Sequence, residues 1–238
     1  MPRSFAGFDP AALAFLRNLE KHNRRDWFQP RKEQFERLLK SPMAELVEAI
    51  NGALARFAPE HVNDPAKAIY RIYRDTRFSP DKTPYKTHVG AIFPRRGAEK
   101  HASAGFYFEV SHQYVGVAGG LYMPGPEELL AVRTHLAAGY RAFRKLLDGK
   151  ELRGAMGSIQ GERLSRAPKG FPAEHPAADL LRHKQWYWWS ELDSSLALTP
   201  ELLPELLKRF RLMAPAIEFL NAPIAGRRKR PAADEFLV

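Results

Sequence analysis

The sequence predicts an α+β protein, in which a central antiparallel β-meander sheet is packed by N-terminal helices, a middle helix and a C-terminal helix. Helical periodicity fills the first sixty residues and returns twice later in the chain. Residues 68–122, by contrast, hold short segments rich in Ile, Tyr, Phe and Val, which are typical of strands. The loops between these segments are too short for crossover helices, so the strands are expected to pair antiparallel.

Three helices joined by short turns are expected at the start of the chain. Asp9-Pro10 is an N-cap followed by proline at the first helical position, and leucines follow at helical spacing as far as Leu19. A second helix is expected to begin at Asp26. Ser41-Pro42 then opens a third helix, which runs to about Phe57.

The sheet is predicted from alternation and from β-branched and aromatic content. Phe106 and Phe108 alternate with Tyr107 and Glu109, which is the period of a half-buried strand. The expected strands are residues 68–78, 88–93, 105–111, 114–122 and 186–192.

Two short stretches within these strands carry further predictions. The aromatic run at 186–189 would place alternate residues on opposite faces, so that one pair packs in the core while the other is a candidate for exposure. The glycines of 116–120 indicate a close backbone approach or a bulge, and could leave room for a ligand.

The rest of the chain returns to helix. Gly125-Pro126 begins a middle helix that runs to about Gly149, and Thr199-Pro200 caps a final helix that Pro215 is expected to kink or divide. We expect a single α+β domain over residues 1–225, followed by a basic and mobile tail over residues 226–238.

Composition excludes several classes of site. The chain has no cysteine, which removes disulfides, thiolate nucleophiles, thiolate zinc sites and iron–sulfur clusters. It shows no signal-peptide pattern and no apolar run of membrane-spanning length, so a cytoplasmic protein without membrane association is expected. The net charge of +10 favours a polyanionic or phosphorylated partner.

Residues 71–86 carry the strongest functional signal. This segment holds five cations and two carboxylates, and such groups are costly to bury unless they are paired. As a strand it would place Arg71, Asp75 and Arg77 on one face, and Pro80 and Pro84 would then brace an irregular loop. The segment is therefore either an ion-pair lattice or an anion-binding site.

The leading hypothesis is a basic pocket that binds a phosphorylated or carboxylated small molecule. Arginine forks match planar anions, and lysines add mobile charge. If the protein is an enzyme, which the sequence leaves open, Asp81 and Tyr85 are the first candidates for proton transfer. The predicted ligand-binding residues are Arg71, Arg74, Asp75, Arg77, Lys82, Lys86 and His88.

Two alternatives remain open. The same cations, together with exposed aromatic residues, could form a nucleic-acid-binding module. The segment could instead be a structural ion-pair lattice in an interaction protein. No metal or cofactor is expected, since no histidine pair has the H-x-x-x-H spacing and residues 116–120 lie within strands rather than between a strand and a helix. The oligomeric state is not predicted.

The pattern R-x-x-R-D-x-R-F-x-x-x-D-K-x-x-Y resembles the signature of domain-of-unknown-function family 2461. This is a bacterial family of about this length that also occurs as a domain in fungal proteins. Stretches at 23–28, 105–109, 119–122 and 168–171 are similar to the family as well, and the resemblance covers roughly residues 5–220. It implies a fold and a candidate site, without an established activity. The signature falls on Arg71, Arg74, Asp75, Arg77, Phe78, Asp81, Lys82 and Tyr85.

Overall fold

Four strands form one antiparallel sheet, in which their spatial order is their order along the chain. The computed structural model describes residues 4–98 and 102–224, so the predicted tail lies outside the described residues. The strand bounds match the predictions for 88–93 and 105–111, and differ by one residue for the other two. The strands are β1 (His88–Phe93), β2 (Gly105–Ser111), β3 (Tyr114–Leu121) and β4 (Trp186–Asp193).

Helices run along the sheet and beyond both of its ends. Asp9 caps the first helix as predicted, because its carboxylate accepts the backbone N–H of Ala11 at 2.7 Å. The helices of the described chain are α1 (Pro10–Lys21), α2 (Arg25–Phe28), α3 (Lys32–Phe35), α4 (Ser41–Phe57), α5 (Pro65–Ala68), α6 (Pro126–Leu147), α7 (Lys150–Met156), α8 (Ala178–Leu181) and α9 (Leu202–Asn221), with short 3₁₀ helices at Gln29–Arg31, Pro59–His61 and Ser194–Leu198.

The predicted second and third helices follow each other without an intervening loop. A π-helical turn, η2 (Glu36–Lys40), leads directly into α4, and Lys40 and Ser41 both have helical backbone angles. Pro42 has no backbone N–H to give to the carbonyl of Leu38, so an ordinary α-helical turn cannot be completed here. The chain widens its turn at this point and continues as helix.

Pro215 does not divide the last helix. α9 passes through it as one helix from Leu202 to Asn221. Met213 and Ile217, on either side of the proline, are buried, and both lie against Gly119 of β3. Packing of this helix on the sheet therefore outweighs the loss of one internal hydrogen bond at the proline.

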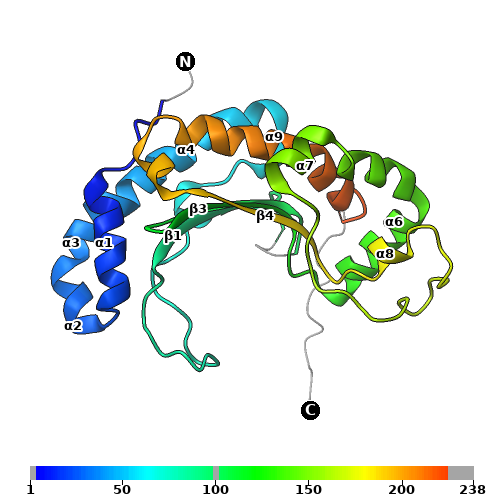
Figure 1. The fold of residues 1–238 in the computed structure, drawn as a ribbon, viewed down its shortest axis with the longest axis horizontal. Helices are drawn as coiled ribbons and strands as arrows, with labels where there is room; N and C mark the ends of the chain where they lie inside the picture. Colours follow the sequence, from blue (N-terminus) through cyan, green and yellow to red (C-terminus); the bar gives the residue numbers. More distant parts are fainter. Residues whose placement is uncertain (1–3, 99–101, 225–238) are drawn as a thin grey trace, which may run out of the picture.

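The sheet has one covered face and one open face. Figure 1 shows α4, α7 and α9 on one side of it, where Phe106, Phe108 and Val110 are fully buried. Tyr107 and Glu109 alternate with these residues and belong to the other face. The predicted aromatic run divides in the same way: Trp186 and Trp188 lie in the core, whereas Tyr187 and Trp189 are half-buried on the open face.

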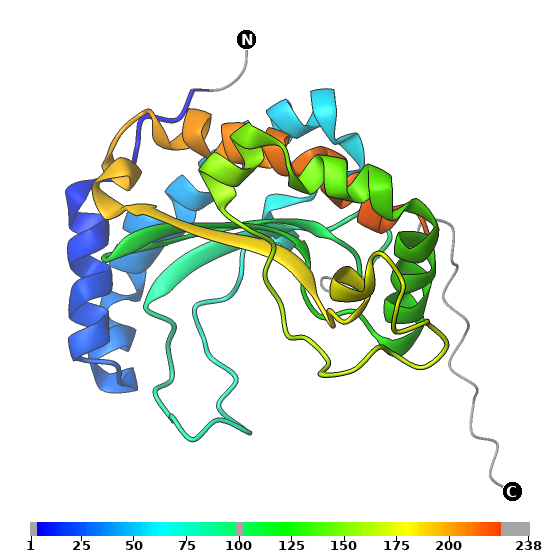
Figure 2. The same cartoon turned by 45° about the vertical axis from the view of Figure 1, so that its right-hand side comes forward.

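The prediction of a strand at residues 68–78 is wrong. Residues 65–68 form α5, and in the described chain the residues that follow form no strand ladder but only the isolated bridges Ile69 to Ala91 and Tyr73 to Tyr85. Pro80 and Pro84 lack the N–H groups that a continuous ladder needs. Residues 69–87 instead form a long loop, which descends from the sheet in both ribbon views (Figures 1 and 2).

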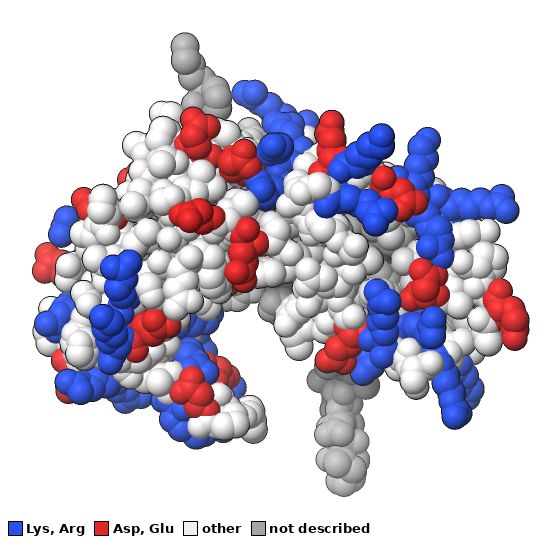
Figure 3. Space-filling view, in the orientation of Figure 1, with Lys and Arg blue, Asp and Glu red and all other residues white. Residues whose placement is uncertain are grey.

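The molecule has the shape of an arch. α1 to α3 descend at one end of the sheet and α6 and α8 at the other, so the open face lies beneath the arch (Figures 1 and 2). The space-filling view shows the surface hollowed at this place (Figure 3). No helix in the described ranges combines the length and the apolar character that spanning a membrane requires.

Candidate functional site

Residues 69–87, called here the signature loop, are held to β1 by one backbone hydrogen bond and closed on themselves by two more. The N–H of Tyr70 donates to the carbonyl of Gly90 at 2.9 Å, and the N–H of Lys86 donates to Ile72 at 2.8 Å. The N–H of Arg74 likewise donates within the loop, to the carbonyl of Pro84 at 2.9 Å. Beyond this bond, side chains hold the tip, residues 75–83.

Arg74 and Asp81 form the central ion pair of the tip. The Arg74 guanidinium donates to the Asp81 carboxylate and to the Thr83 hydroxyl, and lies 3.5 Å from the Ser79 hydroxyl. The backbone N–H of Thr83 donates to the other Asp81 oxygen at 2.9 Å. The Thr83 N–H, and after it Arg74, lower the pKa of Asp81 to about 2. Asp81 is thus an ionised structural acceptor at neutral pH.

A second ion pair lies beside the first. Arg77 donates to both oxygens of Asp75, at 3.0 and 2.8 Å, and these bonds lower the pKa of Asp75 to about 2. Arg71 acts on Asp75 only as a weaker, more distant charge. Lys82 donates to the carbonyl of Thr76 at 2.9 Å. The predicted cations of the tip are therefore directed at groups of the tip itself.

Tyr85 belongs to the core. It is 1% exposed, and its ring stacks on Phe28 with the centroids 4.2 Å apart. Among the described residues its buried hydroxyl has no hydrogen-bond partner. Asn23 binds its backbone twice, accepting the Tyr85 N–H at 3.0 Å and donating to the Tyr85 carbonyl at 2.9 Å. A role in proton transfer stays a prediction for Tyr85, and its surroundings favour a packing role.

His88 lies beside a buried carboxylate on the open face. Its Nε2 is 3.5 Å from Oε2 of Glu109, the oxygen to which the Tyr107 hydroxyl donates. The Tyr114 hydroxyl donates to Oε1 of the same carboxylate at 2.6 Å. Burial, and then the Glu109 charge, raise the pKa of Tyr107. Burial lowers the pKa of His88, Glu109 opposes this effect, and the charge of Lys86 adds to it. His88 is therefore neutral at neutral pH.

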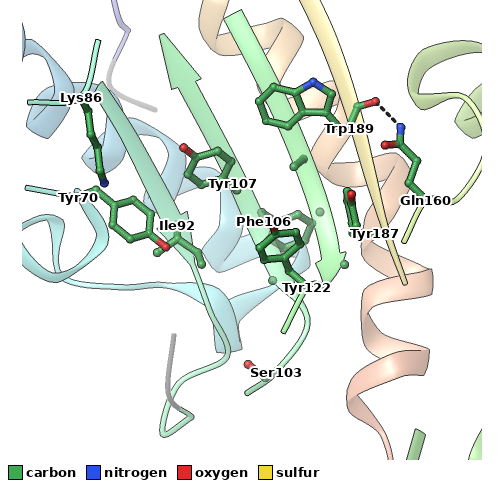
Figure 4. A pocket seen from close by; sticks show the side chains of 14 residues that line it. Tyr70, Lys86, Ile92, Ser103, Phe106, Tyr107, Tyr122, Gln160, Tyr187 and Trp189 are labelled. Carbon is green, nitrogen blue, oxygen red and sulfur yellow. Dashed lines mark hydrogen bonds between the residues drawn. The ribbon is translucent and has the colours of Figure 1, made fainter. Parts of the chain in front are cut away.

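The open face also holds a cavity of about 500 Å³, which we call the sheet pocket. Figure 4 shows its aromatic walls, with Lys86 at one side and Gln160 at the other. The Gln160 amide donates to the carbonyl of Trp189 at 3.2 Å. The residues that line it are Tyr70, Lys86, Ile92, Ser103, Gly105, Phe106, Tyr107, Ala118, Gly119, Gly120, Tyr122, Gln160, Tyr187 and Trp189.

Lys86 connects the signature loop to this pocket. Its ammonium lies 4.5 Å from the ring centroid of Tyr70, whose own ring meets that of Tyr107 edge to face at 6.0 Å. Burial raises the pKa of Tyr70 to about 12, so the phenol stays neutral. Of the predicted ligand-binding residues, all of which are described, Lys86 is the one that lines the pocket.

Sequence reasoning missed most of the aromatic wall. The glycine signal at 116–120 and the alternation at 186–189 both pointed to this face, and Gly119, Gly120, Tyr187 and Trp189 do line the pocket. Gln160 comes from an irregular segment that carries no sequence signal. No group of three or more His, Asp or Glu side chains that could hold a metal ion occurs within residues 4–98 and 102–224.

Comparison with known proteins assigns most of the chain to one family. A search of curated proteins finds no match to the chain. A family model described as "Conserved hypothetical protein (DUF2461)" matches residues 11–219, which include every strand, the signature loop and the sheet pocket. The match covers well over half of the sequence and agrees with the resemblance of the signature. The chain therefore belongs to the conserved hypothetical protein family DUF2461.

Proposed function

We propose that the sheet pocket binds a small molecule in which a flat ring is joined to a carboxylate or phosphate group. The observation that carries this proposal is the placement of Lys86 at the side of a ring-lined cavity. In this proposal the anionic ligand lies between the sheet and the ends of the signature loop, which contribute Tyr70 and Lys86. It does not lie at the tip of the loop.

The size and lining of the pocket support a ring-bearing ligand. A volume of about 500 Å³ falls within the range of small-molecule sites. Gly105, Ala118 and Gly120 line the pocket without large side chains, which leaves its volume open. The ring centroids of Tyr107 and Trp189 are 6.5 Å apart. Such rings stack favourably on a flat ligand.

Charge supports an anionic group on that ligand. Lys86 brings an ammonium to the wall, and the chain as a whole carries a net charge of +10. The phenol of Tyr70, held neutral by its raised pKa, lies against that ammonium and adds no negative charge of its own. The Gln160 amide offers a further polar group at the other side of the pocket.

Thermal-shift and calorimetric titrations with matched ligand pairs test the proposal. The pairs are 2-naphthoate with 2-naphthamide, indole-3-carboxylate with its amide, and adenosine monophosphate with adenosine. At least one anion should raise the Tm and bind more tightly than its uncharged counterpart. Lys86→Met should weaken that anion by about 10- to 100-fold, because a charged hydrogen bond contributes about 1.5–3 kcal/mol.

Lys82→Met is the matched control. Lys82 lies on the same loop, but its ammonium donates to Thr76 in the tip, so its loss should leave the Kd of the anion within about threefold. Lys86→Arg should retain most of the affinity. The proposal is wrong if no member of the panel binds, or if Lys82→Met weakens the anion as much as Lys86→Met does.

A second candidate is single-stranded nucleic acid, bound by the tip and the adjoining Tyr73. Phe78 is 92% exposed and Tyr73 is 42% exposed, and the guanidinium of Arg77 lies 5.7 Å from the Phe78 ring centroid. Exposed rings beside cations suit base stacking. A labelled oligonucleotide should then bind with an affinity that falls steeply with salt and drops on Phe78→Ala. An absence of binding at low salt rejects this candidate.

A further inference from the structure

The chain that follows α7 runs along the edge of β4 and fixes the backbone of Gln160 there. The N–H of Gln160 donates to the carbonyl of Tyr187 at 2.7 Å, and the N–H of Tyr187 donates to the carbonyl of Gln160 at 3.4 Å. A further backbone bond joins the N–H of Lys184 to the carbonyl of Glu162 at 2.8 Å. Gln160 therefore lies on a segment that is attached to the sheet at more than one point.

Gly161 allows this segment to come so close to its neighbour. Its φ is +131°, in the region that favours glycine, and a Cβ atom there would come within 2.3 Å of the carbonyl oxygen of Gln185. The position of the Gln160 backbone is thus set by the edge of the sheet, and a ligand in the pocket is not needed to hold it.

The side chain of Gln160 is oriented by a second contact with the same edge. Its amide nitrogen donates to the carbonyl of Trp189 at 3.2 Å. A carbonyl oxygen can only accept a hydrogen bond, so the nitrogen of the amide must face Trp189 and Oε1 must face away from it. Figure 4 shows Oε1 turned toward the rings of the pocket. No donor within residues 4–98 and 102–224 is hydrogen-bonded to this oxygen.

The sheet pocket thus has two different polar groups at its two sides. Lys86 brings an ammonium to one side, and Oε1 of Gln160 is an uncharged acceptor at the other, with the ring of Tyr107 between them (Figure 4). An ammonium attracts an anion, whereas an amide oxygen accepts hydrogen bonds from N–H or O–H groups. A ligand that spans the pocket would satisfy both sides only if it carried an anionic group and a donor at opposite ends.

We propose that Gln160 is a specificity-determining residue of the sheet pocket, which selects ring-bearing anions that carry a hydrogen-bond donor, such as an amino group, on the part of the ring away from the anionic group. This inference rests on the proposed function, because Lys86 would hold the anionic group of the same ligand. Oε1 of Gln160 accepts the donor's hydrogen, while the amide nitrogen stays bound to Trp189. Aromatic acids and nucleotides can both carry such a donor.

Calorimetric titration of the full chain with pairs of anions that differ in one donor tests this inference. The pairs are 6-amino-2-naphthoate with 6-methyl-2-naphthoate, indole-3-carboxylate with benzofuran-3-carboxylate, and adenosine monophosphate with purine riboside monophosphate, which lacks the amino group. In at least one pair the member with the donor should bind about 3- to 10-fold more tightly, as expected for a hydrogen bond between uncharged groups. The difference is modest because Gln160 is exposed, so water competes for its oxygen.

Gln160→Met removes the acceptor and keeps the approximate length of the side chain. It should abolish the difference between the two members of that pair, and should change the Kd of the member without the donor by less than about threefold. Gln113→Met is the matched control, since Gln113 is an exposed glutamine between β2 and β3 that does not line the pocket, and it should preserve the difference. Lys86→Met should weaken both members by the same factor.

Three results would overturn the inference and leave the proposed function standing. The first is equal binding of both members of every pair to the native protein. The second is a donor advantage that persists in Gln160→Met. The third is a Gln160→Met variant that weakens both members equally, which would mean that Gln160 only holds its segment at the sheet edge. Binding of no anion at all removes the inference and the proposed function together. The pair that shows the difference distinguishes an aromatic acid from a nucleotide.

Discussion

The indole of Trp189 lies directly over Gly116 of the neighbouring strand. A Cβ atom built on Gly116 would come within 2.3 Å of Cη2 of Trp189, and within 3.1 Å of Cγ of Glu109. The indole N–H donates to Glu191, which is the residue paired with Gly116 across the sheet, at 3.0 Å. The absence of a side chain at Gly116 thus lets the indole lie along the sheet and form a wall of the pocket.

Gly116→Ala should displace this ring. The added methyl cannot fit under the indole, so we expect a loss of about 1–3 kcal/mol in the free energy of unfolding. We also expect a lower affinity for any ring-bearing ligand. Urea denaturation measures the first quantity, and the NMR signal of the Trp189 indole N–H reports the displacement. Gly52→Ala is the control: a Cβ there meets nothing within 4 Å in the middle of α4, so the protein should gain about 0.5–1 kcal/mol.

The two carboxylates of the signature loop should titrate at unusually low pH. The pKa values of Asp75 and Asp81 are lowered to about 2 in the folded protein, against about 3.9 for a free aspartate. Because the folded values are depressed, the ion pairs stabilise the tip above about pH 4 and are lost as the pH falls towards 2. The amide signals of Arg77 and Thr83, which donate to these carboxylates, should follow this titration.

Arg74→Gln provides the internal control for that titration. It should raise the midpoint of Asp81 part of the way to the ordinary value, since the N–H of Thr83 contributes the larger share of the shift. Asp75 is bound by Arg77 and should keep its midpoint. Midpoints near 4 for both carboxylates in the native protein would show that the lattice does not form in solution.

Local pattern was enough to predict the sheet and its two faces. Alternation at Tyr107 and Glu109 placed both on the face opposite Phe106 and Phe108, because side chains of a strand point alternately to its two sides. The same rule divided the run at 186–189 correctly. Pattern failed at residues 68–78, where β-branched and aromatic content predicted a strand although Pro80 and Pro84 withhold the N–H groups that a ladder needs.

The candidate site was harder to predict, because side-chain partners depend on the path of the loop. The charge density of 71–86 marked the segment, but its cations could converge on a ligand or on neighbouring groups. The path taken directs Arg74 and Arg77 to Asp81 and Asp75, and brings Lys86 alone of the predicted ligand-binding residues to the pocket wall. No local pattern distinguishes these outcomes.

Tyr85→Phe should leave the protein at least as stable as the native chain. The buried hydroxyl of Tyr85 has no partner among the described residues, so its removal gives up no hydrogen bond and relieves the burial of a polar group. We expect the free energy of unfolding to stay the same or to rise by up to about 1 kcal/mol. Tyr85→Ala should lower it by about 3–5 kcal/mol, since the ring stacked on Phe28 is lost. A Tyr85→Phe variant that folds normally but loses activity would instead support proton transfer by this hydroxyl.

Asn23→Ala should loosen the signature loop from the helical end of the arch. Asn23 and Tyr85 stand 62 residues apart, and the amide of Asn23 satisfies both the N–H and the carbonyl of Tyr85, as a neighbouring strand would. Its removal leaves two backbone groups at a buried residue without these partners, so the free energy of unfolding should fall by about 2–3 kcal/mol. Amide exchange should quicken at Tyr85 more than in the strands of the sheet. Asn18→Ala, at an exposed position of α1, should change stability by less than about 0.5 kcal/mol. Equal effects of the two substitutions would mean that the bonds to Tyr85 do not hold the loop.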